Sequence, residues 1–329
     1  MPNVNRRGKI IIVVVLALLL IVIGALFFPV PQPGVHLAAN YGLGEHGPEP
    51  FFKLGPIYFS NTLITSLMSV LVLSTLFFFG TRKMKLVPTG LQNFCEVIIQ
   101  IMLDFVEGIA GKENSRRFLA ICGTIFLFVL TNAWMGLLPF YNVIGWGHEG
   151  QSDTLLNSIA GSIFPAYEGF IVHTALFRPA NTDVNVPLML ALVSFISVEY
   201  WGISSLGKDY FKKFFRFNQF FGALGLLVRG KIKSALSGLF YGFIDIFVGT
   251  LELISEFVRI VSFTFRLFGN MTAGEVLLLM MAFLIPWLIP VLFYGLETLL
   301  GAIQALIFGG LTVVFATLAV ASHHAEEHD

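Results

Sequence analysis

Residues 239–285 read LFYGFIDIFVGTLELISEFVRIVSFTFRLFGNMTAGEVLLLMMAFLI, an apolar and helix-compatible stretch that meets no proline before Pro286. A helix of this length would measure about 70 Å, whereas the hydrocarbon core of a bilayer is about 30 Å thick. We therefore expect the helix to tilt steeply, to lie nearly along the membrane, or to break near Gly269-Asn270 or Gly274.

A second over-long apolar stretch, Trp287–Ala321, follows directly. Within it Glu297 and Gln304 lie seven residues apart and so share a helix face, and the small residue Gly301 between them permits close helix approach. The two stretches together predict a carboxyl-terminal hairpin of two long, strongly tilted intramembrane helices.

The composition of the whole chain agrees with a membrane location. Of its 329 residues 56% are hydrophobic and 12% charged, whereas soluble domains contain about 25% charged residues. The net charge of zero provides no overall field that would attract nucleic acid. The composition predicts an all-α integral membrane protein.

Apolar runs of about 20 residues predict further membrane spans upstream. The expected spans are Ile10–Phe28 (an N-terminal anchor helix), Ile57–Phe79, Phe118–Phe140 and Val184–Ser204. Thr89–Gly111 is amphipathic and is expected to lie along the membrane interface. Pro29–Pro56 and Val143–Arg178 are expected to be exterior loops. These elements predict three parts: residues 1–56, residues 57–238 and the translocating hairpin with its acidic tail, 239–329.

Basic residues indicate the orientation of the chain. They cluster at residues 6–9, 82–85, 112–117 and 208–233, and the expected spans place every cluster on one side, which the positive-inside rule makes cytoplasmic. We expect both termini in the cytoplasm, with residues 10–28 as an uncleaved anchor. The alternative is that this first helix is a cleaved secretory signal.

Charged residues inside the over-long helix are regularly spaced. Asp245, Glu252, Arg259 and Arg266 follow one another at intervals of seven, which returns to nearly the same helix face. Arg266 has no carboxylate nearby in the sequence, and a charge at the bilayer centre costs at least about 2.5–3.5 kcal/mol. Arginine stays protonated at any relevant pH. We therefore expect a carboxylate from elsewhere to approach Arg266 and leave again.

Other polar residues near Arg266 can move protons or hold water. The carboxyl groups of Glu275 and Glu297 can relay protons, and the amides of Asn270 and Gln304 can either position water or form ordinary interhelical hydrogen bonds. Glu275 lies nine residues after Arg266, about 180° around an ideal helix. Glu256, three residues before Arg259, fits a purely structural ion pair equally well.

The residues around Arg266 resemble a known family. Residues 262–275, SFTFRLFGNMTAGE, resemble the signature of subunit a of rotary F-type ATP synthases, and Glu297 through Gln304 to Thr312 resembles its last helix. The carboxyl end, ASHHAEEH, is similar to the cytoplasmic tail of bacterial members. The resemblance is strong over residues 239–321, moderate over 56–140 and 178–205, and absent over 1–40 and 143–176.

The resemblance implies the stator subunit of the Fo sector, or CF(0), in a bacterial inner membrane. It implies that Arg266 faces the carboxylates of a ring of c subunits and separates two aqueous half-channels. The implied exterior half-channel uses Asn270, Glu275, Glu297 and Gln304, and the cytoplasmic one uses Glu252 and Ser262. Proton flow would turn the ring and so drive ATP synthesis on other subunits, with subunit b of the peripheral stalk as a further partner. No catalysis by this chain, cofactor, metal or nucleic acid is expected.

Several alternatives stay open at this stage. Many relatives carry a histidine at one of the positions of Glu275 and Glu297, so the sequence does not say which of these two acids takes the entering proton, nor whether the ion is H⁺ or Na⁺. A rotor-independent secondary transporter or ion channel would also contain buried charges and broken helices. Such a transporter is expected to show related halves, and the sequence has no internal repeat.

Overall fold

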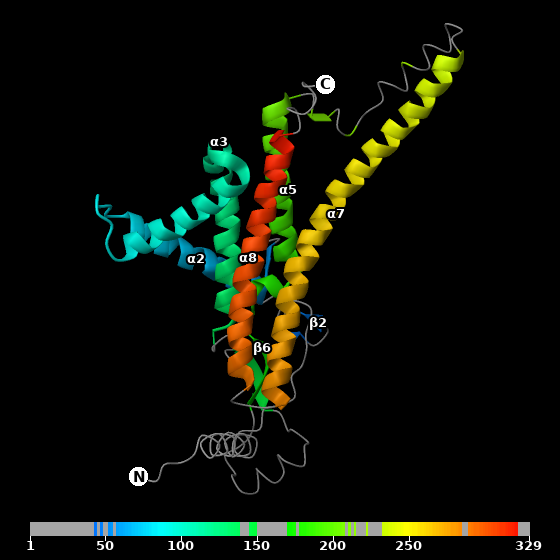
Figure 1. Cartoon of the computed structure of the whole chain (residues 1–329). Helices are drawn as coiled ribbons and strands as arrows, with labels where there is room; N and C mark the ends of the chain where they lie inside the picture. The colour runs from blue at the N-terminus through cyan, green and yellow to red at the C-terminus, as the bar shows by residue number, and fades with distance from the viewer. Residues whose placement is uncertain are drawn as a thin grey trace, which may run out of the picture. The chain divides into compact units, whose positions relative to one another are not determined.

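The structure is a computed structural model of the chain (Figure 1). It describes residues 43–44, 47–48, 52–54, 57–138, 145–149, 170–175, 178–207, 210–211, 214, 222, 232–284 and 289–321. The expected anchor helix at residues 10–28 and the tail after Ala321 lie outside the described residues.

Long helices make up most of the described chain. They are α2 (Asn61–Thr81), α3 (Leu91–Gly136), α5 (Asn185–Leu206), α7 (Ile232–Leu284) and α8 (Ile289–Ala321). Within the described ranges, the four helices α2, α3, α5 and α8 are long and apolar enough to cross a membrane. The predicted class, a helical integral membrane protein with several spans, is confirmed.

Short antiparallel hairpins accompany the helices. The strand pairs are β1 (Leu43–Gly44) with β2 (Gly47–Pro48), β3 (Phe52–Leu54) with β4 (Ile57–Phe59), and β5 (Gly145–Glu149) with β6 (Phe170–Ala175). All but β4 lie in the segments that the sequence assigns to exterior loops. Their pairing was not predicted, because these segments are read from proline and glycine content alone.

The start of α2 corrects the expected span Ile57–Phe79. Residues 57–59 form β4, and the helix begins only at Asn61. Ser60 has extended backbone and its hydroxyl accepts a hydrogen bond from the Leu63 N–H at 3.2 Å, which is the geometry of a helix N-cap. Apolar composition continues through this boundary, so the capping serine locates it better than hydropathy does.

Helix α3 joins two elements that the sequence separates. Residues 112–117, expected to connect the interfacial helix 89–111 to the span 118–140, are helical, and a single non-helical residue, Gly111, interrupts α3. Gly111 has φ 74° and ψ 167°, a region open essentially to glycine alone. Figure 1 shows that α3 is bent, with its two parts running in different directions.

Helix α7 is unbroken over 53 residues, or about 80 Å. It begins at Ile232, seven residues before the expected start, and continues through Gly269 and Gly274. The described glycines with positive φ are Gly90, Gly111 and Gly207, none of which is in α7. Of the three expected arrangements of this helix, the break near Gly269-Asn270 or Gly274 is therefore wrong.

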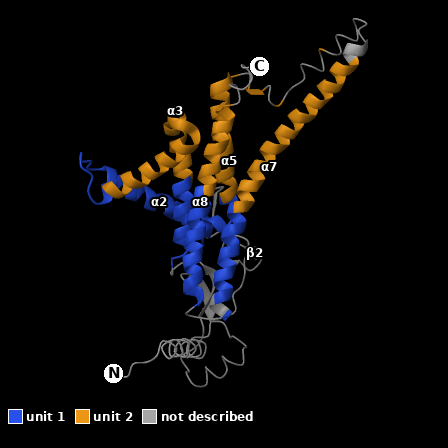
Figure 2. Cartoon of the chain, in the orientation of Figure 1, with its two compact units in different colours: residues 1–92, 126–186, 267–306 blue, residues 93–125, 187–266, 307–329 orange. Residues whose placement is uncertain are grey.

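The chain divides into two compact units (Figure 2). Unit 1 comprises residues 1–92, 126–186 and 267–306, and unit 2 comprises residues 93–125, 187–266 and 307–329. Helices α3, α7 and α8 each contribute to both units. The predicted division of the chain into three functional parts, with boundaries after residues 56 and 238, stays a prediction.

The interior of unit 2 is largely apolar. The Phe118 and Trp201 rings pack with centroids 4.6 Å apart. Gly202 lies against Tyr210, so that a Cβ at position 202 would collide with the tyrosine ring. The buried cluster comprises Val106, Phe118, Cys122, Val198, Trp201, Tyr210, Val313, Ala316 and Ala319.

Part of the interior of unit 1, by contrast, is polar. The buried Ser69 hydroxyl of α2 donates to Asn132 Oδ1 of α3 at 2.6 Å. The Thr62 hydroxyl donates to Asp183 Oδ2 at 2.9 Å, next to the 3₁₀ turn η1 (Ala180–Thr182). These hydrogen bonds connect α2 to α3 and to the segment that precedes α5.

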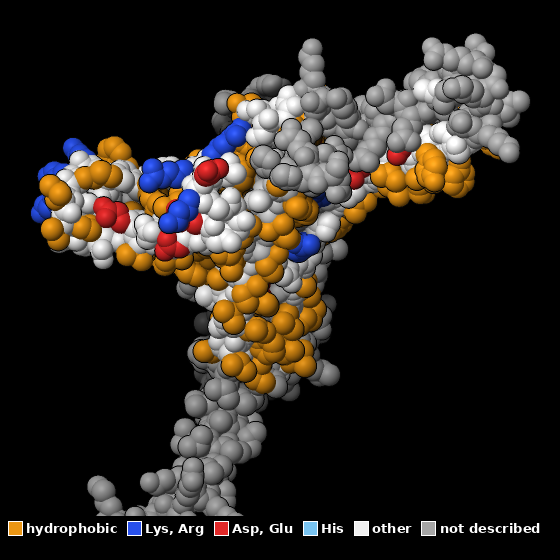
Figure 3. Space-filling view, turned by 45° about the horizontal axis from the view of Figure 1, so that its top comes forward, with side chains coloured by type: hydrophobic (Ala, Val, Ile, Leu, Met, Phe, Trp, Pro, Cys, Tyr) orange, Lys and Arg blue, Asp and Glu red, His pale blue; other side chains and the backbone are white. Residues whose placement is uncertain are grey.

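Large apolar side chains cover much of the described surface (Figure 3). Leu71 of α2, Ile196 of α5 and Leu292 of α8 are 65%, 63% and 74% exposed. Wide exposed apolar surface is unusual for a protein that faces water. It agrees with helices that face lipid.

Candidate functional site

Arg266 lies on α7 without a counter-charge in the part of the chain that the structure describes. Its side chain is partly buried, and its guanidinium carbon lies 5.8 Å from the centroid of the Phe263 ring. Within the described ranges it makes neither an ion pair nor a hydrogen bond. The neighbouring Phe263 and Leu267 are buried, whereas Phe265 is exposed. This cation is therefore available to a group from outside the described residues.

Arg259, one heptad earlier, has a very different environment. Its two terminal nitrogens contact the two Glu256 carboxylate oxygens at 2.7 and 3.1 Å. Its guanidinium carbon lies 3.8 Å from the centroid of the Phe315 ring, which is close enough for a cation–π interaction. The structural interpretation of Glu256 and Arg259 agrees with this geometry, because the pair is neutralised and covered.

Asn270 and Gln304 connect α7 to α8 within unit 1. The Asn270 side-chain amide donates to Gln304 Oε1 at 3.0 Å. Gln304 is buried, and its Nε2 has no hydrogen-bond partner among the described residues. A buried amide donor without a partner is costly unless water or another group satisfies it. The Asn270–Gln304 hydrogen bond therefore leaves Gln304 Nε2 available as a donor beside the contact of α7 with α8.

Glu297 of α8 packs against α7 at a glycine. Its carboxyl group lies over Gly274, where a Cβ would collide with both carboxyl oxygens. Glu297 is 8% exposed and has neither a hydrogen bond nor an ion pair to any described residue. The backbone at Gly274 is helical, so this glycine is needed for space and not for an unusual backbone conformation.

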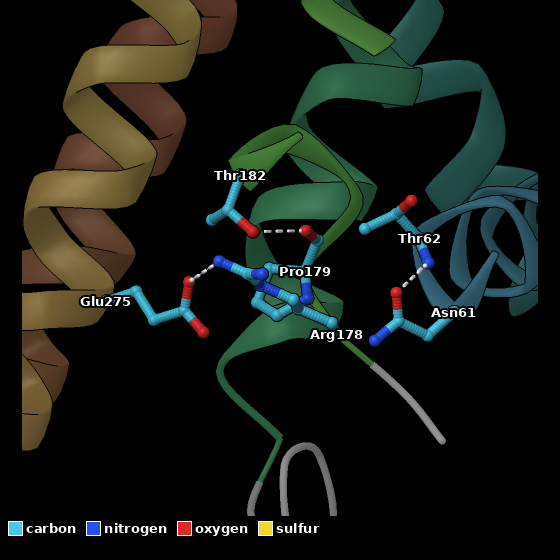
Figure 4. Close-up of polar contacts among 6 residues, drawn as sticks. All are labelled: Asn61, Thr62, Arg178, Pro179, Thr182 and Glu275. Atoms are coloured by element: carbon cyan, nitrogen blue, oxygen red, sulfur yellow. Dashed lines mark hydrogen bonds and ion pairs between the residues drawn. The ribbon is translucent and has the colours of Figure 1, made fainter. Parts of the chain in front are cut away.

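Glu275 is paired with Arg178, a residue that the sequence does not single out. Arg178 Nη2 lies 3.5 Å from Glu275 Oε2, and the two side chains are only 8% and 15% exposed (Figure 4). The sequence assigns Arg178 to the end of an exterior loop, whereas the structure buries it. Its apolar neighbours, Leu176 and Phe177, and Pro179 directly after it are the available signals that this arginine is not an ordinary loop residue.

The turn after Arg178 is held firmly. The Pro179 carbonyl accepts hydrogen bonds from the Thr182 hydroxyl at 2.7 Å and from the Thr182 N–H at 3.2 Å (Figure 4). Pro179 packs on Gly136 of α3, where a Cβ would come within 2.8 Å of the proline ring. The Asn181 amide contacts the Val129 carbonyl of α3 at 3.4 Å. Arg178 is thus positioned by the end of α3 and by η1.

The remaining expected site residues, Glu252 and Ser262, lie on α7 before Arg266. Glu252 is partly buried and Ser262 is exposed. Both belong to unit 2, as does Arg266, whereas Asn270, Glu275, Glu297 and Gln304 belong to unit 1. The structure thus brings the four residues of the expected exterior half-channel into one unit and the other three into the second.

Comparison with known proteins gives a consistent result. A family model described as ATP synthase A chain matches residues 62–317. A protein of Gloeobacter violaceus, ATP synthase subunit a, is 32% identical over 280 residues, which cover 85% of this chain and 92% of that protein. The ATP synthase subunit a of two Helicobacter pylori strains, P12 and J99, is 30% identical over 273 residues, covering 82% of this chain and 95% of theirs.

Proposed function

The chain belongs to the ATP synthase A chain family, and from that membership we propose how its membrane charges carry protons. A member of this family is a multi-pass membrane protein of the ATP synthase complex. It is the stator subunit for proton translocation in the Fo sector, and catalysis on nucleotides is left to other subunits.

Arg266 is the proposed counter-charge for a carboxylate on a rotating ring of c subunits. The supporting observation is its contrast with Arg259, which is neutralised by Glu256, whereas Arg266 makes no ion pair within the described ranges. A permanent cation favours the ionised form of a carboxylate that approaches it. Because the ring carboxylate must be deprotonated when it passes Arg266, protons cannot leak directly between the two sides.

The proposed half-channels lie before and after Arg266 along α7. Protons enter from the exterior through Asn270, Glu275, Glu297 and Gln304, and they leave to the cytoplasm past Glu252 and Ser262. Carboxyl groups exchange protons with water, and amide groups orient water between them. A full turn of the ring therefore moves protons across the membrane and drives ATP synthesis in the attached soluble head.

The same proposal extends to assembly and location. The wide exposed apolar surface suits contact with lipid and with the helices of the c ring. Subunit b of the peripheral stalk is the second proposed partner, since a stator must be anchored to the head. The proposed location is a bacterial inner membrane with both termini in the cytoplasm.

The experiment for this proposal replaces Arg266 in the assembled complex. Arg266→Ala is expected to abolish proton-driven ATP synthesis in membrane vesicles while the amount of assembled complex stays at the wild-type level. The matched control is the double variant Glu256→Gln/Arg259→Gln, which removes the charge one heptad earlier without leaving an unpaired ion. The control is expected to keep most of the activity, and normal synthesis by Arg266→Ala would refute the proposal.

A further inference from the structure

We infer that Arg178 keeps Glu275 as a permanent carboxylate, so that Glu297 is the acid that accepts the entering proton. The inference rests on the proposed function and deepens it. It assigns different roles to two acids that the sequence treats alike, and it gives a positioning role to an arginine outside the family signature around Arg266.

The first step is the burial of the Arg178–Glu275 pair. The guanidinium of Arg178 is permanently charged, and its side chain is 8% exposed within 3.5 Å of the Glu275 carboxylate. Protonation of Glu275 would remove this counter-charge from a buried cation, and breaking one side of a buried ion pair is strongly unfavourable. Glu275 is therefore poorly suited to gain and lose a proton once per transport step.

The second step is the different environment of Glu297. Its carboxyl group lies over the backbone of Gly274 with no cation beside it in the described part of the chain. Protonating Glu297 breaks no ion pair there. Glu297 can therefore change its protonation state without disturbing a charge partner, whereas Glu275 cannot.

The third step is the arrangement of contacts between α7 and α8. Gly274 meets Glu297, Asn270 bonds to Gln304, and Phe263 packs on Phe308 with ring centroids 4.9 Å apart. Along α7 the positions 274, 270 and 266 follow at intervals of four and lie on neighbouring parts of one face. Within unit 1, the Asn270–Gln304 amide pair therefore lies one helical turn along α7 from Gly274, against which Glu297 packs.

The proton transfer that follows is simple. A proton from exterior water forms an O–H bond on a Glu297 carboxylate oxygen, and the same proton later passes to the ring carboxylate, which restores the Glu297 anion. Glu275 neither gains nor loses a proton. Beside Arg178, the Glu275 carboxylate contributes a fixed negative charge. Glu275 directly follows Gly274, the residue against which Glu297 packs.

The test measures proton flux through the complete complex in vesicles, with the amount of assembled complex determined in parallel. Arg178→Gln and Glu275→Gln each remove one member of the buried ion pair and are expected to slow flux several-fold. The double variant Arg178→Gln/Glu275→Gln removes both charges and is expected to recover to about half of the wild-type flux, as coupled sites do in a double-mutant cycle. Arg178→Lys, which keeps the charge, is expected to keep most of the flux.

Glu297→Gln is expected to lower flux at least about tenfold in the wild type and in the neutral double variant, because it removes the proton acceptor. Gly274→Ala is expected to lower flux by displacing the Glu297 carboxyl group. Its matched control is Gly295→Ala, since position 295 has open space for a Cβ.

Three results would overturn the inference. They are a double variant no better than Glu275→Gln, a double variant that fails to assemble although either single variant assembles, and a Glu297→Gln variant that keeps most of its flux. Arg266→Ala, measured alongside, distinguishes a failure of the proposed function from a failure of the roles assigned to Glu275 and Glu297. If it abolishes ATP synthesis while the double variant fails to recover, only the assignment of Glu275 and Glu297 is wrong.

Discussion

Two turns of α7, one heptad apart, present the same cation in opposite settings. At the first, Arg259 is paired with Glu256 at 2.7 Å and lies over the Phe315 ring. At the second, Arg266 has only a distant contact with Phe263 and no carboxylate within the described ranges. Sequence spacing makes the two arginines equivalent, whereas their neighbours give Arg259 an ion pair and leave Arg266 as the proposed site.

The comparison shows what separates a structural from a functional charge in a membrane helix. A buried charge that already has its partner has no remaining capacity to attract another group. A charge without a partner is costly to maintain, so its presence indicates a partner that is supplied intermittently. Giving Arg266 a partner should therefore inactivate it, and removing the partner of Arg259 should only destabilise the protein.

The largest expected effect comes from giving Arg266 a carboxylate partner on α7, as Arg259 already has. Ser262→Glu would place a carboxylate four residues before Arg266, in the favourable order for a helical ion pair. We expect ATP synthesis to fall at least about tenfold because Arg266 would be occupied when the ring carboxylate arrives. Ser262→Gln, of similar size but uncharged, should lose much less activity, and equal losses in the two variants would contradict the comparison.

A smaller effect is expected at the first turn. Glu256→Gln leaves the Arg259 cation without its partner and should destabilise the complex by about 3 kcal/mol, whereas Glu256→Gln/Arg259→Gln should come close to the wild type. Thermal unfolding of the purified complex measures both variants. A single variant as stable as the double variant would mean that the pair contributes nothing to the fold.

The smallest effect concerns Tyr210, which is close enough to the Glu256–Arg259 pair to be influenced by its charges. Burial, and then the neighbouring Glu199 carboxylate, raises the pKa of the Tyr210 hydroxyl above its ordinary value of 10.0. Tyr210→Phe removes its hydrogen bond to Glu199 and should cost about 1–2 kcal/mol.

The same shift predicts a pH dependence with a definite sign. Because the pKa is raised in the folded state, the stability that the neutral hydroxyl provides is complete below pH 10 and declines as the pH rises above that value. Thermal unfolding measured on both sides of pH 10 should fall more steeply for the wild type than for Tyr210→Phe. Parallel curves would show that Tyr210 does not titrate differently in the folded protein.

Hydropathy and charge spacing predicted much of this fold. The span Val184–Ser204 corresponds closely to α5, and the end of the expected interfacial helix coincides with Gly111. The start of α2 was placed too early, because apolar residues continue across the Ser60 cap. The hairpins were missed because their segments, apart from β4, were assigned to loops from proline and glycine content, and in one of them the paired strands β5 and β6 are also far apart in the sequence.

The sequence indicated contacts of the candidate site where the residues lie on one helix or repeat at helical spacing. The Glu256–Arg259 pair and the face shared by Glu297 and Gln304 are of this kind. The Arg178–Glu275 pair joins residues 97 positions apart, and no local pattern reveals such a contact. The sequence indicates which side chains can carry a charge or a proton. Which of these charges pair with each other depends on the folded chain.

The continuity of α7 has a consequence for the metal ions that its backbone could bind. Proteins that carry Na⁺ through the membrane often unwind a helix at the binding site, so that freed backbone carbonyls replace the water around the ion. In α7 the carbonyls of the interior turns stay engaged in helical hydrogen bonds past Arg266, Gly269 and Gly274. The interior turns of α7 therefore offer no cage of free backbone oxygens to a metal cation, and only side chains along this helix could coordinate one.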